Sequence, residues 1–202
     1  MKLIIMTKRN FFVEEDKILS SLFDEGLECL HLYKPDSDPI LSERLLTLLS
    51  DDCRRRVVVH DHFYLKDEYH LRGIHLNNAD DEVPKSYGGY VSRTCHSVGE
   101  LKAAKKGSSY VFLKTVFDSL SNPADKQTLS YDELLRASDQ GLIDKKVMAM
   151  GGMKLDNLRM ARDLGFGGVV VCGDLWNRFD IHSELDYKEL IAHFVKLKKA
   201  VG

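Results

Sequence analysis

The chain has 202 residues, of which 44% are hydrophobic and 30% are charged, and its formal net charge is −2. This length suits one domain of ordinary size, and the composition excludes an intrinsically disordered chain. A net charge so close to zero gives no reason to expect nucleic acid or an anionic membrane as a partner. No hydrophobic run approaches the roughly 18 residues of a membrane span, and the first six residues predict a strand rather than a signal peptide.

The cysteines are widely spaced and form no CxxC pair: Cys29, Cys53, Cys95 and Cys172. This pattern argues against a structural zinc site and against a disulfide framework. Isolated thiols are typical of a reducing compartment, so we expect a cytoplasmic protein.

Short hydrophobic runs and amphipathic segments alternate along the chain. The pattern predicts strands at residues 2–7, 28–32, 56–59, 74–76, 90–93, 109–114, 146–150 and 168–172. It predicts helices at residues 13–25, 39–51, 97–106, 156–164 and 187–200. Gly26 follows the first helix as a C-cap glycine would. Ser97 and Ser130 are each followed three residues later by a glutamate, which is the capping-box pattern of a helix start.

Strands that are hydrophobic on both faces and alternate with helices predict a parallel sheet. Eight such units predict a small (β/α)8 TIM barrel that occupies residues 1–202 as a single domain. A doubly wound sheet is the alternative.

In a (β/α)8 barrel, functional side chains gather at the carboxyl ends of the strands. Five of the eight histidines lie in or just after predicted strands: His31, His60, His62, His75 and His96. The other three, His70, His182 and His193, are expected at the surface.

Glycines directly follow the seventh and eighth predicted strands. Gly151 and Gly152 come after the seventh, and Cys172 and Gly173 end the eighth. Glycines at these two strand ends expose backbone N–H groups where a phosphate can bind. They therefore predict a phosphate site, although a Gly-Gly pair is also typical of a tight turn. Cys172 is expected to be a small packing residue beside it.

Several segments in this order resemble the thiamin phosphate synthase/TenI family over nearly the whole chain. They are residues 30–35 (LHLYKP), 59–61 (VHD), 73–76 (GIHL) with Asp80, 94–97 (TCHS), 110–116, 149–153 (AMGGM) and 165–173. The resemblance implies a TIM barrel of thiamin biosynthesis that binds a phosphorylated thiazole. A homodimer is left open.

The synthases of this family join a thiazole phosphate to a pyrimidine methyl diphosphate and release pyrophosphate. The resemblance implies that Asp61 and Asp80 hold Mg²⁺ against the diphosphate, with His60 at the position of the family's asparagine. Oxygen ligands suit Mg²⁺, whereas a histidine makes the site softer. Helix-capping and loop roles are the alternative for these residues.

Two departures from the synthase pattern weaken that implication. Tyr33, Lys34 and Pro35 stand where synthases carry an Arg-Glu-Lys grip on the diphosphate, and tyrosine cannot supply a bidentate guanidinium. Residues 119–122 (SLSN) replace a Thr-x-Thr-Lys loop. The predicted ligand-binding set, besides the glycines and Cys172, is His31, Tyr33, Lys34, Lys114 and Ser119. His31 also suits an interior position within its strand.

The TenI-like branch resembles the same barrel without synthase activity and shifts a double bond in a thiazole carboxylate precursor. A histidine at the position of His96 carries the proton in that branch, and histidine suits proton transfer near neutral pH. The first hypothesis is a TenI-like tautomerase that uses His96 and requires no metal. The alternatives are a synthase with Mg²⁺ and a non-catalytic binder of the phosphorylated ligand.

Overall fold

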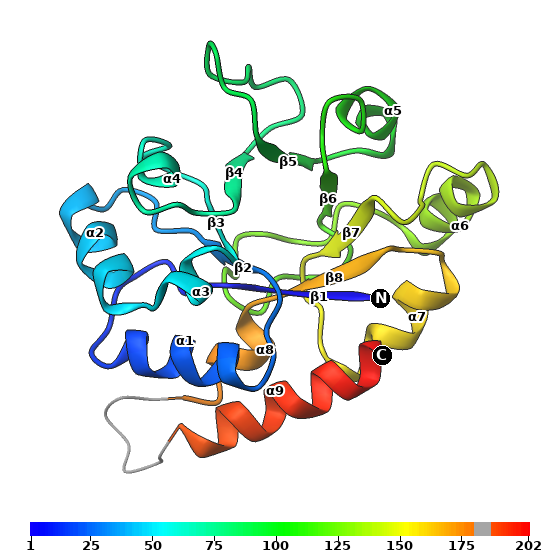
Figure 1. The fold of residues 1–202 in the computed structure, drawn as a ribbon. Coiled ribbons are helices and arrows are strands. Elements are labelled where there is room, and N and C mark those ends of the chain that lie inside the picture. Colours follow the sequence, from blue (N-terminus) through cyan, green and yellow to red (C-terminus); the bar gives the residue numbers. More distant parts are fainter. Residues whose placement is uncertain (180–186) are drawn as a thin grey trace.

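A computed structural model of the chain describes residues 1–179 and 187–202. Eight parallel strands pair in chain order, and the last pairs with the first, so the sheet closes into a barrel (Figure 1). This closure confirms the (β/α)8 prediction and excludes the doubly wound sheet. The strands are β1 Lys2–Met6, β2 Leu30–Leu32, β3 Val57–Val59, β4 Gly73–Leu76, β5 Tyr90–Cys95, β6 Tyr110–Lys114, β7 Val147–Met150 and β8 Gly168–Val171.

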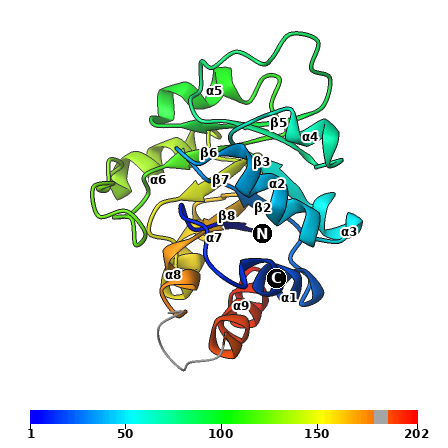
Figure 2. The same ribbon diagram turned by 90° about the vertical axis from the view of Figure 1, so that its left-hand side faces the viewer.

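The helices lie around the outside of the barrel, as the two views in Figures 1 and 2 show. They are α1 Glu15–Asp24, α2 Pro39–Leu48, α3 Asp51–Arg54, α4 Leu65–Glu68, α5 Leu101–Ala104, α6 Tyr131–Asp139, α7 Leu158–Asp163, α8 Gly173–Trp176 and α9 Lys188–Val201, with 3₁₀ turns η1 Val98–Glu100 and η2 Leu155–Asn157. The one-turn helices α3, α4 and α8 were not predicted, because four residues are too few for a helical period to appear.

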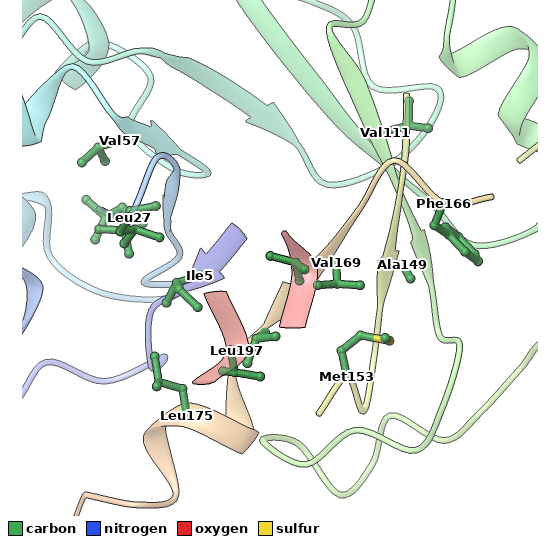
Figure 3. Close-up of a cluster of buried hydrophobic side chains, with 14 of the residues drawn as sticks. Ile5, Leu27, Val57, Val111, Ala149, Met153, Phe166, Val169, Leu175 and Leu197 are labelled. Carbon is green, nitrogen blue, oxygen red and sulfur yellow. The ribbon is translucent and has the colours of Figure 1, made fainter. Parts of the chain in front are cut away.

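Two separate layers of hydrophobic side chains hold the barrel together. The outer layer lies between the strands and the helices, and Figure 3 shows Ile5 and Val169 from the strands with Leu175 of α8 and Leu197 of α9. The inner layer fills the barrel itself and consists of Ile4, Met6, Cys29, Val58, Tyr110, Phe112, Met148 and Val170. Strands such as β3, β7 and β8 are therefore buried on both faces, which explains their continuous hydrophobic sequences.

The two capping-box patterns behave differently. At α6, the Ser130 hydroxyl accepts the Glu133 N–H at 3.2 Å, as predicted. Ahead of α5, the Ser97 hydroxyl instead donates to the Glu100 carboxylate at 2.9 Å, and the same carboxylate accepts the His96 N–H at 2.9 Å. Glu100 therefore fixes the backbone at His96.

The chain ends meet beside α9. The N-terminal amino group donates to the Val201 carbonyl at 2.6 Å, and both views show the termini close together (Figures 1 and 2). Gly26 has a φ of 88°, as expected of a C-cap glycine. Among the described residues, no helix combines the length and the apolar character needed to cross a membrane.

Two of the histidines expected at the surface can be assessed. His70 is exposed, as predicted. The prediction that His193 lies at the surface is wrong. Its side chain is buried, and its ring contacts the Asp174 carboxylate at 2.7 Å, because α9 packs against α8. His182 lies outside the described residues.

Candidate active site

A cavity of about 730 Å³ lies at the carboxyl ends of the strands. This is the end where (β/α)8 enzymes carry their active sites, and the volume is typical of a site for a small organic ligand. Most of the predicted site residues line it: Tyr33, His60, His96, Lys114, Ser119, Gly151, Gly152, Cys172 and Gly173. Four others do not line it: His31, Lys34, Asp61 and Asp80.

The glycine turns after β7 and β8 are required by close backbone packing. Gly151 and Gly152 have φ values of 99° and 59°, and a Cβ on Gly151 would lie 2.4 Å from Thr115 Cγ2. A Cβ on Gly173 would lie 2.6 Å from the Leu120 carbonyl carbon. Both turns therefore bring bare backbone to the cavity wall, where a ligand can approach it closely.

His96 is exposed on the cavity wall directly after β5. The hydrogen bond from its backbone N–H to Glu100 fixes the position of its Cα, while the imidazole remains accessible from the cavity. His96 and the glycine turns thus line one and the same cavity.

Lys34 has a structural environment that the sequence did not reveal. Its ammonium contacts both carboxylate oxygens of Glu15, at 2.6 and 2.9 Å, and donates to the Asn10 carbonyl at 3.1 Å. Both side chains of the ion pair are 2% exposed. Burial raises the pKa of the Glu15 carboxyl and lowers that of the Lys34 ammonium, but their mutual contact opposes both shifts. Lys34 therefore holds α1 against the end of β2 and does not face the cavity.

Two cations that the sequence analysis did not select line the cavity after β1, namely Lys8 and Arg9. The Arg9 guanidinium lies 5.7 Å from the Tyr33 ring centroid and 3.5 Å from the exposed Asp36 carboxylate. Both directly follow the first predicted strand, so the rule that functional side chains gather at carboxyl ends of strands also points to them.

The loop between β6 and α6 also lines the cavity. Lys114 forms an ion pair with Asp125 at 2.9 Å, and both residues line the cavity. In the same loop, Ser119 and Ser121 lie 3.4 Å apart through their hydroxyl oxygens. Lys114 is therefore a partly neutralised cation at the ligand site.

The predicted Mg²⁺ ligands do not come together. Asp80 is exposed, whereas Asp61 is partly buried. The Asp61 carboxylate accepts the backbone N–H of Lys34, and its Oδ2 atom is buried without a hydrogen-bond partner. Burial raises the pKa of Asp61. Among the described histidines, cysteines and carboxylates, one group alone has three ligand atoms within 4.8 Å of one another, and it comprises His31, His60 and His75. Asp61, Asp80 and His60 therefore do not form one coordination site here, and Mg²⁺ binding stays a prediction.

The three histidines form a buried cluster beneath the cavity. His31 Nδ1 lies 2.8 Å from His60 Nε2, and the His60 and His75 rings stack with centroids 4.2 Å apart. Burial lowers the pKa of each ring, to about 4 for His60. The three rings are therefore neutral at pH 7. Of the three, His60 alone lines the cavity.

The hydrogen bonds define the tautomers of two of these rings. The Asn77 Oδ1 atom, 3.0 Å from His60 Nδ1, can only accept, so His60 carries its proton on Nδ1 and has a lone pair on Nε2. His31 must then donate from Nδ1 and accept from the Tyr110 hydroxyl at Nε2. Burial raises the pKa of Tyr110, so its hydroxyl keeps the proton that it donates.

Comparisons with known proteins agree with this architecture. A family model for thiamine monophosphate synthase matches residues 3–175. A crystal structure of thiamine phosphate pyrophosphorylase from Bacteroides thetaiotaomicron is 50% identical, with 99% of this chain and 97% of that chain covered and a TM-score of 0.89. The thiamine-phosphate synthase of Methylobacillus flagellatus is 27% identical over 145 residues, which are 67% of this chain and 68% of that protein. Thiamine phosphate pyrophosphorylase from Pyrococcus furiosus is 18% identical over 99% of this chain and 95% of that chain, and its TM-score of 0.75 shows the shared fold.

Proposed function

The chain belongs to the thiamin phosphate synthase/TenI family, and from that premise we propose that it is a TenI-like tautomerase acting on a phosphorylated thiazole. In this proposal the phosphate binds at Gly151, Gly152 and Gly173, and His96 carries the proton. A cytoplasmic location and a homodimer remain expectations.

The observation that carries the proposal is that His96 and both glycine turns line one cavity. A phosphate bound at the turns keeps the attached ring inside the cavity that His96 faces. The His96 imidazole removes a proton from a carbon at one end of the conjugated thiazole system and returns it to a carbon at the other end. The double bond shifts, and the reaction balances without a second substrate.

Cations on the cavity wall suit the charge of the thiazole carboxylate phosphate. Lys8 and Arg9 follow β1, and Lys114 ends β6. Charge-assisted contacts from such groups orient a phosphate and a carboxylate better than neutral hydrogen bonds do. We assign Lys8 and Arg9 to the carboxylate and Lys114 to the phosphate.

Synthase activity has weaker support. Its reaction releases a diphosphate, whose developing charge must be neutralised in the transition state. The only lysine of residues 30–35 is Lys34, and its ammonium forms the buried ion pair with Glu15. Tyr33 stands where the synthases carry their arginine. The synthase remains the second candidate because a thiamine phosphate pyrophosphorylase that is 50% identical aligns over almost the whole chain.

Two parallel incubations of the untagged protein separate these functions. In the first, the thiazole carboxylate phosphate alone should be isomerised, with the change followed by proton NMR. In the second, thiazole phosphate, pyrimidine methyl diphosphate and MgCl₂ should yield little thiamin phosphate. Efficient thiamin phosphate formation would establish the synthase instead, and calorimetric binding without turnover in either incubation would establish a binder.

The matched variants for the first incubation are His96→Ala and His70→Ala. Both remove an exposed histidine, but only His96 lines the cavity. Loss of isomerisation in His96→Ala alone is the result expected. Equal rates in the two variants would remove His96 from the mechanism.

A further inference from the structure

Three histidines from neighbouring strands meet in the barrel interior. His31 lies in β2, His60 follows β3 directly, and His75 lies in β4. One ring nitrogen of each lies within 4.8 Å of one ring nitrogen of each of the others, and their exposed fractions are 0, 4 and 0%. We propose that these histidines form a binding site for a divalent transition-metal ion such as Zn²⁺. The site goes beyond the proposed isomerisation, which does not require it.

Each ring already has the outer partner that a metal-binding histidine needs. His60 Nδ1 donates to Asn77 at 3.0 Å, His75 Nδ1 lies 2.8 Å from the Ser92 hydroxyl, and His31 Nε2 contacts the Tyr110 hydroxyl. A hydrogen bond at one ring nitrogen orients the ring and directs the other nitrogen toward a metal. The second nitrogens of His31 and His60 face each other within the cluster. The second nitrogen of His75, Nε2, lies 2.8 Å from the Thr94 hydroxyl, and that contact must open when the ion binds.

The closest contact of the cluster holds a proton that a metal ion can replace. His31 Nδ1 and His60 Nε2 are 2.8 Å apart, and one proton lies between them. When a metal takes both lone pairs, the His31 proton moves to Nε2 and the Tyr110 hydroxyl turns from donor to acceptor. No proton leaves the site, because the rings are neutral before and after binding.

The dimensions and the ligand type favour zinc or a neighbouring transition metal over magnesium. Zinc–nitrogen bonds of about 2.0–2.1 Å place two ligand nitrogens roughly 3.3 Å apart in a tetrahedral site. Small side-chain shifts therefore bring nitrogens within 4.8 Å of one another onto a single ion. Imidazole nitrogens select Zn²⁺, Ni²⁺ and Cu²⁺, whereas Mg²⁺ requires oxygen ligands.

The surroundings give the site a closed floor and an open side. The Phe112 ring lies below, with its centroid 4.7 Å from that of His31 and 4.6 Å from that of His75. His60 and Thr94 line the cavity above, and the Thr94 hydroxyl lies 2.8 Å from His75 Nε2. Three protein ligands with a remaining position toward a cavity are typical of metal ions that also bind water or substrate.

The direct test is zinc retention by the untagged full-length protein. Metals are removed with a chelator, ZnCl₂ is added, excess is removed by desalting, and zinc is measured by mass spectrometry. Wild type is expected to retain about one Zn²⁺ per chain, and CoCl₂ in its place should give the visible absorption of a low-coordinate site. A wild type that retains no zinc would overturn the proposal.

Three variants locate the ion. His60→Gln should weaken Zn²⁺ binding by at least about 100-fold, and Asn77→Ala, which removes an exposed outer partner, by about 10–100-fold. Asn77→Ala keeps the test decisive if His60→Gln does not fold, as judged by near-ultraviolet circular dichroism. The exposed-histidine control His70→Gln should retain zinc like wild type. Unchanged affinity in both His60→Gln and Asn77→Ala, or an equal loss in His70→Gln, would overturn the site.

Discussion

Replacing Lys34 by methionine tests whether this lysine stabilises the fold instead of binding the ligand. Methionine keeps most of the side-chain length but leaves the Glu15 carboxylate buried without its cation. Removing one partner of a buried ion pair costs about 3–5 kcal/mol, which is a large part of the roughly 5–15 kcal/mol stability of a domain. We therefore expect Lys34→Met to lower the free energy of unfolding by about 3–5 kcal/mol at pH 7.

Urea denaturation followed by circular dichroism measures this loss. The double variant Glu15→Gln/Lys34→Met removes both charges and should recover most of the stability. Lys17→Met removes the lysine of an exposed ion pair with Glu14 and should leave the free energy of unfolding nearly unchanged.

The loss in Lys34→Met should also depend on pH. Burial raises the pKa of Glu15 in the folded protein, and removal of Lys34 takes away the contact that opposes this shift. The folded state then binds more protons than the unfolded state above about pH 4.3, so stability falls as the pH rises toward the folded pKa. The difference from wild type should be smaller at pH 5 than at pH 8. A stability equal to wild type together with a large rise in KM for the phosphorylated ligand would refute the structural role.

Three further expectations concern Gly151, with Gly107 as its control, His60 and Lys8. Gly107→Ala, at a φ of 78° with no atom within 4 Å of its Cβ, should lose about 1–2 kcal/mol of unfolding free energy. Gly151→Ala should lose about 1–3 kcal/mol more than Gly107→Ala, because its methyl group would overpack against Thr115. Equal losses of unfolding free energy in the two variants, measured by urea titration, would contradict this contact. In metal-free protein, burial lowers the pKa of His60 to about 4, so the unfolded state binds more protons below about pH 6.5. The free energy of unfolding of wild type should therefore fall by about 3 kcal/mol through His60 as the pH falls from 6.5 to 4. In His60→Gln the urea midpoint should depend less steeply on pH over this range. Lys8→Met should raise the KM for the thiazole carboxylate phosphate about 10-fold with little change in stability, and an unchanged KM would exclude Lys8 from the ligand site.

The barrel could be predicted from sequence because each strand carries a local signal. Strands such as β3 and β8 are continuously hydrophobic because both of their faces are buried, and polar residues such as His60 and His96 mark strand ends. The shared location of His96 with Gly151 and Gly152 follows from the same rule, since all carboxyl ends of a parallel barrel meet on one side. Closure by the pairing of β1 with β8 is then the only arrangement that leaves no exposed edge.

Contacts between distant segments could not be predicted from the sequence. The Lys34–Glu15 pair joins the end of β2 to the start of α1, and no periodicity connects residues 19 positions apart. The histidine cluster joins residues of β2, β3 and β4, and its existence depends on which side of each short strand faces the barrel interior. A three-residue strand gives no reliable alternation from which to read that direction.

Solvent deuterium incorporation tests the central claim most directly. The protein is incubated in D₂O with the thiazole carboxylate phosphate, and NMR follows the isotope at the carbon that receives the proton. Wild type and His70→Ala should introduce deuterium as the double bond shifts, because a proton held by His96 exchanges with solvent through the cavity. His96→Ala should show neither the shift nor the label. Deuterium incorporation at the wild-type rate in His96→Ala, or no isomerisation by wild type, would contradict the account.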